Sequence, residues 1–225
     1  MENIIVASNI KRAFQTGEKE PFYALKGVSP EIPAGALTLL RGRSGSGKTT
    51  LMNILGALDL PTEGEVWFNG KNICTMSEHE RSVLRRTQIG FVFQSVALIP
   101  IMSAYENVEF ALRLARYEGD RRKRAEECLK MVGLGSRMSH MPQELSGGEQ
   151  QRVAIARAIA HKPAVIFADE PTAELDTATG LQVVRIFKDL CAEEKLTFVM
   201  TTHDTGLMEI GDKVYQLEDG EFING

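Results

Sequence analysis

The sequence predicts an α/β fold with a mostly parallel sheet, extended by an antiparallel β subdomain and interrupted by an inserted helical subdomain. Four short apolar runs do not alternate with polar residues, which is typical of strands buried on both faces of a sheet. Helix-length segments separate these runs, so crossover helices would bring the strands into the sheet in the same direction. The four runs are ALTLL at 36–40, QIGFVF at 88–93, AVIFA at 164–168 and TFVMT at 197–201.

Size and composition are those of a globular chain. The chain has 225 residues, of which 43% are hydrophobic and 25% charged, and its formal net charge is −4. We expect a single domain over residues 1–225, with an α/β core at about 1–95 and 146–225 and a helical subdomain at about 96–145. Because there is no basic excess, we expect no nucleic-acid partner.

Two tight turns predict the antiparallel additions. Asn69-Gly70 lies inside GEVWFNGKNI at 64–73, and Asp219-Gly220 lies inside VYQLEDGEFI at 214–223. Asn-Gly and Asp-Gly favour type I′ turns, in which both central residues have positive φ. Each segment is therefore expected to form a β-hairpin.

The stretch from Ala104 to about Arg137 is charged and favours helix. ENVEFALRLARYEG and RRKRAEECLKMVG predict two helices around a turn near Gly119 and Asp120. The basic run RRKR at 121–124 permits a nucleic-acid or lipid contact, but nearby acidic residues favour a solvated helix face. This region is the predicted helical subdomain.

Cysteine usage and the first residues lead us to expect a cytoplasmic protein. Cys74, Cys128 and Cys191 lack CxxC spacing, so we expect reduced packing residues and neither a disulfide framework nor a zinc site. MENIIVASNIKR does not resemble a signal peptide, and no stretch approaches the ~18 apolar residues that span a bilayer. A role at a membrane would therefore require a partner.

GRSGSGKT at 42–49 matches the phosphate-binding pattern GxxxxGK(S/T). It follows a predicted strand and precedes TTLMNILGAL, which favours helix, and this context distinguishes a P-loop from an ordinary glycine-rich turn. Backbone N–H groups and the helix dipole would face the phosphates. We expect Lys48 to contact the β- and γ-phosphates, Thr49 to bind Mg²⁺ and Thr50 to add a phosphate hydrogen bond. The predicted core is therefore that of a P-loop NTPase.

Polar side chains also follow three of the other predicted strands. AVIFADEPT places Asp169 and Glu170 at the end of its strand, where a P-loop enzyme needs a carboxylate for Mg²⁺ and a group that polarises water. His203 ends TFVMTTH and is expected to bond the γ-phosphate and the water, although a lone histidine is more often structural. Gln94 ends QIGFVFQ and alone carries no prediction.

LSGGEQQRVAIARA at 145–158 opens a predicted helix with two glycines, each of which costs about 1 kcal/mol in a helix interior. We predict that Ser146, Gly147 and Gly148 form a helix N-terminus whose N–H groups and dipole face an anion. A flexible turn before an ordinary helix is the alternative for this stretch by itself.

In this order, the motifs resemble the nucleotide-binding subunit of an ATP-binding cassette (ABC) transporter, and the resemblance covers essentially the whole chain. GRSGSGKT corresponds to the Walker A motif, Gln94 to the Q-loop, LSGGEQ to the signature, VIFADEPT to Walker B, AELD at 173–176 to the D-loop and His203 to the switch histidine. Phe14 falls where the family has an aromatic residue that stacks on adenine. The signature is the most specific of these elements, because many P-loop enzymes lack it.

The resemblance implies an ATPase that uses ATP and Mg²⁺. Catalysis would rest on Glu170, His203, Gln94 and Lys48, and the metal would be held by Thr49, Gln94 and Asp169. Two subunits of the family pair head to tail, so the signature would serve a nucleotide bound to a second copy. The residues implied in nucleotide binding are Phe14, Gly42, Arg43, Ser44, Gly45, Ser46, Gly47, Lys48, Thr49, Thr50, Ser146, Gly147, Gly148 and Asp176.

The implied partners are a second copy in the ATP-bound state and integral membrane permease subunits, which would hold the chain at the cytoplasmic face of the inner membrane. YALKGVS, LMNILGALDLPTEGEV and RRTQIGFVFQ look most like the branch that serves lipoprotein release, macrolide export, antimicrobial-peptide export and the cell-division permease pair. Glu149, Glu174, Arg41 and Arg43 depart from the residues common there, but no catalytic group is lost.

Three other functions stay open. An ABC-type ATPase acting on nucleic acid or ribosomes would carry long coiled-coil insertions or a second cassette, and this sequence has neither. A nucleoside or metabolite kinase would leave LSGGEQ, Gln94 and His203 without roles. A non-hydrolysing nucleotide sensor would be expected to lack Glu170.

The loop QSVALIPIMSAYENV at 94–108 contains an uninterrupted apolar run at 96–102. Such a run on a surface connection indicates a partner site, or it packs against the subdomain beneath. Since this region of the family receives a cytoplasmic helix of the permease, we expect Leu98 and Ile99 to contact the permease.

Overall fold

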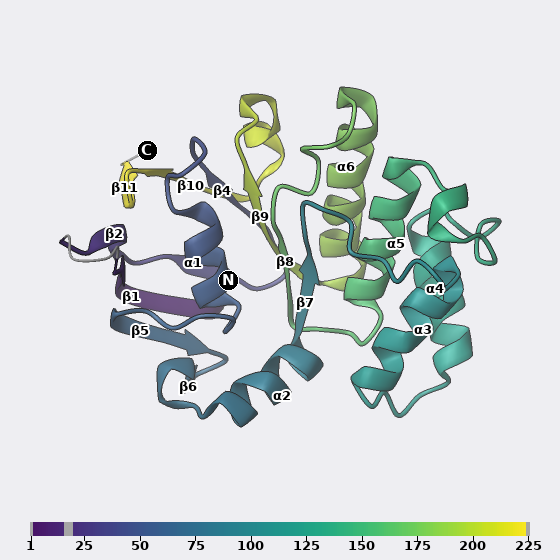
Figure 1. Cartoon of the computed structure of the whole chain (residues 1–225), viewed down its shortest axis with the longest axis horizontal. Coiled ribbons are helices and arrows are strands. Elements are labelled where there is room, and N and C mark those ends of the chain that lie inside the picture. Colours follow the sequence, from purple (N-terminus) through teal and green to yellow (C-terminus); the bar gives the residue numbers. More distant parts are fainter. Residues whose placement is uncertain (1, 16–19, 224–225) are drawn as a thin grey trace.

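The computed structural model describes residues 2–15 and 20–223, which form two sheets with helices around them (Figure 1). The larger sheet has the order β11-β10-β4-β9-β8-β7, and every neighbouring pair is parallel except β10 and β11. The four predicted apolar strands are confirmed as β4, β7, β8 and β9. The strands of this sheet are β4 (Leu37–Arg41), β7 (Ile89–Val92), β8 (Val165–Ala168), β9 (Thr197–Thr202), β10 (Lys213–Glu218) and β11 (Glu221–Ile223).

The second sheet is antiparallel, as predicted, and the two tight turns behave as their sequences indicate. Asn69 and Gly70 have φ of 46° and 73°, and Asp219 and Gly220 have φ of 47° and 82°, so both hairpins turn through positive φ. The first hairpin joins two strands of this sheet, whereas the second joins β10 to β11. The strands of the antiparallel sheet are β1 (Asn3–Phe14), β2 (Phe22–Val28), β3 (Glu31–Pro33), β5 (Glu63–Phe68) and β6 (Lys71–Asn72).

Helix α1 (Lys48–Leu55) lies between the two sheets (Figure 1). Its buried side chains, including Leu51 and Ile54, join a core cluster with Ile5 of β1 and Phe167 of β8. A second core cluster covers the other face of the larger sheet and includes residues from the helices at 104–114, 121–131, 147–159 and 177–194. The sandwiched position of α1 fixes the P-loop at the junction of the two sheets.

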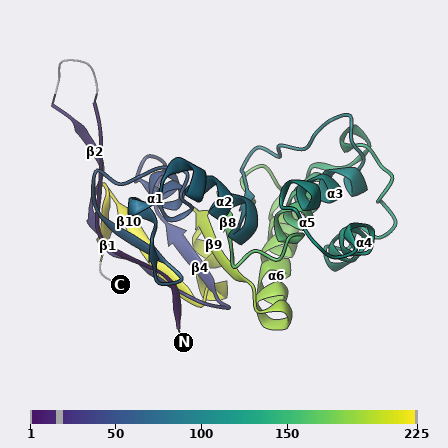
Figure 2. The same ribbon diagram turned by 90° about the horizontal axis from the view of Figure 1, so that it is seen from below.

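Five further α-helices occur in the described part of the chain. Figure 2 shows α3, α4 and α5 gathered at the end of the molecule away from β1 and β2. The two helices predicted for the helical subdomain are confirmed as α3 and α4, and Asp120 accepts a hydrogen bond from the Lys123 N–H at the start of α4. Among the described residues, no helix combines the length and apolar character needed to cross a bilayer. The helices are α2 (Glu78–Gln88), α3 (Ala104–Leu114), α4 (Arg121–Met131), α5 (Gly147–Ile159) and α6 (Thr177–Glu194), with short 3₁₀ helices at Ile73–Thr75, Pro142–Glu144 and Thr205–Ile210.

One prediction for the basic run at 121–124 is wrong. Arg121, Arg122 and Lys123 are exposed, but Arg124 is buried. Its guanidinium donates to the carbonyl oxygens of Ala160 and Ile159 at 3.0 and 3.2 Å, at the C-terminal end of α5. The reason is that helix C-termini leave carbonyls that need donors. Arg124 therefore joins α4 to α5 instead of facing solvent.

The cysteines are free thiols. Cys128 and Cys191 lie in the core, where burial raises their pKa to about 11 and to about 12. Cys74 is partly buried. These surroundings agree with the prediction of packing residues, because buried thiols with a raised pKa are weak nucleophiles.

Candidate functional site

The P-loop connects β4 to α1 in a conformation that requires its glycines. Gly45 and Gly47 have φ of 81° and 104°, a region that side chains disfavour. A Cβ at Gly47 would lie 2.6 Å from the Ala24 carbonyl oxygen, and one at Gly42 would lie 2.2 Å from that of Leu217. The loop therefore packs closely against β2 and β10.

Lys48 is the first residue of α1, and its side chain is 4% exposed. The ammonium donates to the carbonyl oxygens of Gly42 and Arg43 at 2.9 and 3.0 Å, and it lies 3.4 Å from Glu170 Oε1. A buried ammonium needs such partners. The same group sits inside the curl of the loop, where it would meet a phosphate.

Asp169 follows β8, and hydroxyls from two neighbouring elements contact it. The Thr49 hydroxyl donates to Oδ1 and Oδ2 at 3.2 and 3.0 Å, and the Thr201 hydroxyl of β9 donates to Oδ1 at 2.6 Å. A carboxylate beside a hydroxyl supplies the hard oxygen donors that Mg²⁺ prefers. Side chains from β9, the end of β8 and the start of α1 therefore form a candidate metal site, and Thr49 and Asp169, two of the three predicted ligands, are in contact there.

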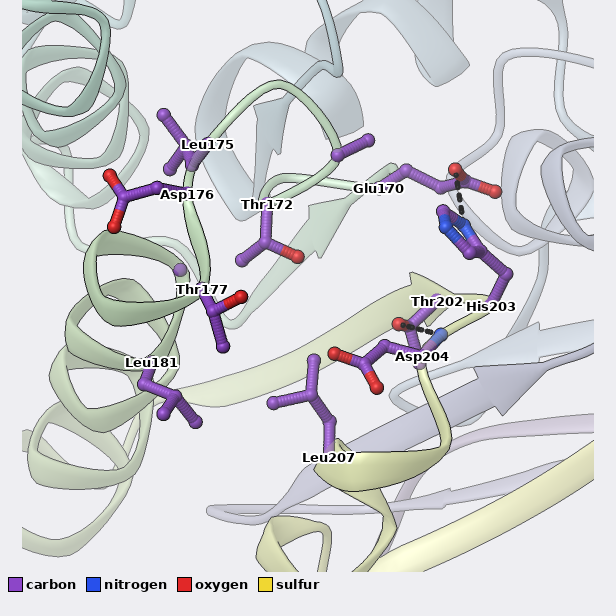
Figure 3. A pocket seen from close by; sticks show the side chains of 12 residues that line it. Glu170, Thr172, Leu175, Asp176, Thr177, Leu181, Thr202, His203, Asp204 and Leu207 are labelled. Atoms are coloured by element: carbon purple, nitrogen blue, oxygen red, sulfur yellow. Dashed lines mark hydrogen bonds and ion pairs between the residues drawn. The ribbon is translucent and has the colours of Figure 1, made fainter.

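Glu170 and His203 face each other beside this site. Glu170 Oε2 lies 3.0 Å from His203 Nδ1 (Figure 3), and the Glu170 N–H donates to the Thr201 hydroxyl at 2.8 Å. Glu170 has φ of 42°, an uncommon conformation for a residue with a side chain. The carboxylate thus lies between a histidine and the P-loop lysine, in a position to act on a water molecule.

These groups surround a cavity of about 720 Å³, which we call the nucleotide cavity. Gln94 lines it too, so the structure brings all four predicted catalytic side chains together. Ser46 and Gly42 of the P-loop, also predicted to bind the nucleotide, do not line this cavity. The lining residues are Phe14, Phe22, Ala24, Arg43, Ser44, Gly45, Gly47, Lys48, Thr49, Thr50, Gln94, Asp169, Glu170 and His203.

Phe14 is one of two exposed aromatic residues at the mouth of this cavity, and its position is supported from behind. The Arg12 guanidinium lies 4.6 Å from the centre of the Phe14 ring, a cation–π distance. Arg12 also makes two hydrogen bonds to the Asp59 carboxylate, at 2.8 and 3.0 Å. Phe22 pairs with Phe14 across β1 and β2. Sequence reasoning missed Arg12, Asp59 and Phe22, because their contacts with Phe14 or with one another depend on tertiary packing.

The signature residues lie outside the nucleotide cavity, at the start of α5. Ser146 caps α5 with a reciprocal capping box to Glu149, so the predicted helix N-terminus is confirmed. Gly148 packs so closely on α6 that a Cβ would lie 2.4 Å from Thr179 Cγ2. Asp176, predicted with the nucleotide ligands, caps α6 here. The signature cavity, about 450 Å³ in volume, is lined by Ser146, Gly147, Gly148, Glu149, Arg152, Glu174, Leu175, Asp176, Thr179 and Gln182.

A third cavity, of about 420 Å³, is lined by residues of the β8–α6 and β9 ends, including Glu170, Asp176 and His203 (Figure 3). Glu170 and His203 belong both to it and to the nucleotide cavity, whereas Leu175 and Asp176 belong both to it and to the signature cavity. The third cavity therefore adjoins each of the other two, which share no lining residue. No residue of the signature cavity lines the nucleotide cavity. Within one chain, the P-loop and the signature, which are both predicted to contact the γ-phosphate, therefore lie in different cavities.

The apolar loop borders a further groove, of about 520 Å³, which we call the apolar groove. Ile99 lines it, but Leu98 packs against the core beneath the helical subdomain. The two neighbouring residues thus have different surroundings. The groove contains apolar side chains from β7, α3 and the loops around them, and arginines of α2 and α5: Leu58, Phe91, Phe93, Ile99, Phe110, Leu114, Arg85, Arg86 and Arg157.

A family model described as "ABC transporter" matches residues 25–173. An ABC transporter ATP-binding protein of Methanocaldococcus jannaschii is 46% identical over 221 residues, which are 98% of each chain. A solved structure from the same organism, described as a dimeric post-hydrolysis state of an ATP-binding cassette bound to ADP and Pi, has a TM-score of 0.88 and 44% identity, and the match covers 98% of this chain and 97% of that one.

A longer relative is similar over only part of its length. The macrolide export ATP-binding/permease protein MacB of Syntrophobacter fumaroxidans is 42% identical over 221 residues. These residues are 97% of this chain and 31% of MacB. The similarity therefore concerns about a third of that protein.

Proposed function

Because this chain belongs to the ABC transporter family and is an ATP-binding, ATP-hydrolysing subunit of it, we propose that it hydrolyses ATP in sites shared between two copies and so drives a membrane permease. The observation that carries the proposal is the separation of the signature cavity from the nucleotide cavity. A head-to-tail dimer unites the two, because each copy offers its signature to the other's P-loop.

ATP binding begins with the exchange of contacts at Lys48. Its ammonium is held by two P-loop carbonyls and by Glu170, and the β- and γ-phosphates offer stronger anionic partners at the same place. The exchange frees Glu170 from the lysine. Phe14 and Phe22 supply aromatic faces for adenine at the mouth of the cavity. Nucleotide binding therefore also prepares the carboxylate for catalysis.

Mg²⁺ fits the oxygen donors that the chain provides. Thr49 and Asp169 are in contact, and Gln94 lines the same cavity. The described residues contain no cluster of three or more His, Cys, Asp or Glu side chains, which suits an ion held by one carboxylate together with water and phosphate. When bound, Mg²⁺ supplies positive charge to the phosphate oxygens.

Glu170 is the proposed catalytic carboxylate. Once Lys48 contacts phosphate, Glu170 accepts a proton from the water that attacks the γ-phosphorus, while the bond from that phosphorus to the β–γ bridging oxygen breaks and ADP leaves. His203 holds the Glu170 side chain through the 3.0 Å contact. Ser146 and the amides of Gly147 and Gly148 of the second copy donate to the γ-phosphate from the opposite side. Asp176 positions the segment between the cavities by capping α6.

The apolar groove is the proposed permease contact, at the cytoplasmic face of the membrane. MacB is described as an ATP-binding/permease protein, which links a region of this kind to a permease. Ile99 follows Gln94 by five residues, and the subdomain at about 96–145 ends at Ser146. A shift of Gln94 on γ-phosphate binding or release would therefore displace this loop and so change the position of the apolar groove.

The substitution Glu170→Gln tests the catalytic proposal. It should leave ATP affinity unchanged, lower turnover by roughly 10²-fold or more because the proton acceptor is lost, and trap a dimer with ATP. Nucleotide titration, phosphate release and size-exclusion chromatography measure the three effects. A variant that stays monomeric with ATP, or that hydrolyses ATP at the parent rate, would contradict the proposal.

Substitutions in the loop test the permease contact. Ile99→Asn should leave folding, ATP binding and dimerisation intact and abolish co-purification with the permease, because an amide replaces an apolar group in the groove. Ile101→Asn is the matched control, since Ile101 is 83% exposed and lies outside the groove lining. Leu98→Asn should instead lower the thermal midpoint. Normal co-purification of the Ile99 variant would exclude the groove as the docking site.

A further inference from the structure

Ser146 is engaged by a side chain of its own helix. Its N–H and its hydroxyl both donate to Glu149 Oε2, at 2.9 and 3.0 Å, and the Glu149 N–H donates back to the hydroxyl at 3.3 Å. A hydroxyl has a single proton to donate. A phosphate oxygen that approaches Ser146 therefore finds that proton already bonded to a carboxylate.

Glu149 also places a negative charge at this helix N-terminus. Hydrogen bonds from the Ser146 N–H and hydroxyl, and then the neighbouring Arg137, hold the pKa of Glu149 below its usual range, so the group is ionised at neutral pH. A carboxylate in the first turn already occupies the favourable end of the helix dipole. The helix N-terminus is thus less attractive to a second anion.

Arg137 partly neutralises this charge. Its Nε lies 3.2 Å from Glu149 Oε1, and it reaches α5 from the segment between α4 and the 3₁₀ turn at Pro142–Glu144. The signature cavity contains other charges: Arg152, Glu174 and Asp176 line it together with Glu149. Of these charged groups, the Glu149 carboxylate is the one that is hydrogen-bonded to the Ser146 hydroxyl, the group needed to bind phosphate.

We propose that Glu149 is a positioning residue that weakens the ATP-closed dimer by competing with the partner's γ-phosphate for the Ser146 hydroxyl, and that Arg137 limits this effect. The inference rests on the proposed function, since it assigns the Ser146 hydroxyl to a nucleotide on the second copy. The proposal predicts that the charge of Glu149 makes the ATP-bound dimer less stable than it would be without that charge. A less stable dimer separates more readily after hydrolysis.

The substitution Glu149→Gln tests the proposal, because glutamine removes the charge and still fits a capping box, while its neutral amide oxygen competes less strongly than a carboxylate for the Ser146 hydroxyl. In a Glu170→Gln parent, ATP should then drive dimerisation with a dissociation constant lower by about fivefold or more, measured by sedimentation velocity. Glu106→Gln is the matched control. Glu106 forms the same box with Ser103 at the start of α3, and neither residue lines the nucleotide or signature cavity. This variant should leave the dissociation constant unchanged.

Arg137→Gln completes the experiment with an effect of the opposite sign. In the Glu170→Gln parent it should raise the dissociation constant by about threefold or more, because the uncompensated carboxylate repels phosphate. Added to Glu149→Gln, it should change nothing, since no carboxylate is left to compensate. Thermal midpoints of all variants report folding separately from dimerisation.

The outcomes separate the inference from the proposed function. If the Glu170→Gln parent does not dimerise with ATP, the proposed function fails. If the parent dimerises and Glu149→Gln matches it within twofold, or the Arg137→Gln effect persists without Glu149, the inference is overturned while the proposed function stands.

Discussion

Gly148→Ala is expected to destabilise the fold, because α5 and α6 touch at this glycine. The added Cβ would lie 2.4 Å from Thr179 Cγ2, against about 3.5–4.0 Å for a normal carbon–carbon contact. Thr179 cannot turn away freely, since its hydroxyl donates to Asp176 Oδ2 at 2.6 Å and supports the cap of α6. Either this hydrogen bond breaks or the two helix N-termini separate.

The magnitude follows from these two routes. Overpacking costs about 1–3 kcal/mol, and loss of the hydrogen bond costs about 0.5–1.5 kcal/mol. The better helix propensity of alanine returns at most ~1 kcal/mol. We therefore expect a net loss of about 1–2 kcal/mol in the free energy of unfolding, or ~2–8 °C in the thermal midpoint of a chain of this size. Chemical and thermal denaturation measure it.

Two further variants make this prediction refutable. Gly147→Ala is the matched control, because its Cβ would lie 3.9 Å from Leu175 Cδ2, an ordinary contact, and the free energy of unfolding should not fall. Thr179→Ser removes Cγ2 and keeps the hydroxyl, so combined with Gly148→Ala it should restore most of the loss. If Gly148→Ala is as stable as the parent, or if Thr179→Ser fails to rescue it, the packing argument is incorrect.

Two other predictions concern the adenine platform and acid stability. Arg12→Ala should weaken ATP binding by about threefold to tenfold and weaken inorganic triphosphate binding by less than twofold, because Arg12 supports the Phe14 ring and not the phosphates; equal losses in calorimetric titration would contradict this role. The Thr179 hydroxyl and then the Thr179 N–H hold the pKa of Asp176 below its usual range. The ionised Asp176 therefore stabilises the fold at pH values above its unfolded pKa. This stabilisation is lost as the pH falls through the folded pKa, below about pH 4. Asp176→Asn should therefore flatten the fall in the free energy of unfolding between about pH 5 and 3, and an unchanged slope would refute this assignment.

The secondary-structure elements that were predicted correctly are those specified by a few residues that are adjacent in the sequence. The four predicted parallel strands are mostly apolar and almost wholly buried. Each of the two tight turns is specified by two residues, Asn69-Gly70 and Asp219-Gly220. Helix α2 was missed because none of its residues is buried, so no apolar stripe existed to give a helical period. The Ser77–Glu80 capping box was its remaining signal.

Site residues that belong to a sequence motif were predicted, whereas site residues that only the tertiary fold brings into contact were not. Lys48, Asp169, Glu170 and His203 come from motifs at strand ends, and the structure brings them to one cavity. Arg12 and Asp59 are 47 residues apart, and they meet only because β1 packs beside the end of α1. Likewise, the different surroundings of Leu98 and Ile99 depend on tertiary packing that an apolar run does not show.

The division of the catalytic groups between two copies is tested most directly by mixing two inactive variants. Lys48→Ala disables the P-loop of its own copy, and Ser146→Ala disables the signature that a copy offers to its partner. In a mixed dimer, the intact P-loop of one copy meets the intact signature of the other, so one site is complete. An equal mixture should recover about a quarter of the parent's ATP hydrolysis, because half of the dimers are mixed and each has one of two sites intact. A mixture no more active than either variant alone would place Lys48 and Ser146 at the same nucleotide within one chain and contradict the shared site.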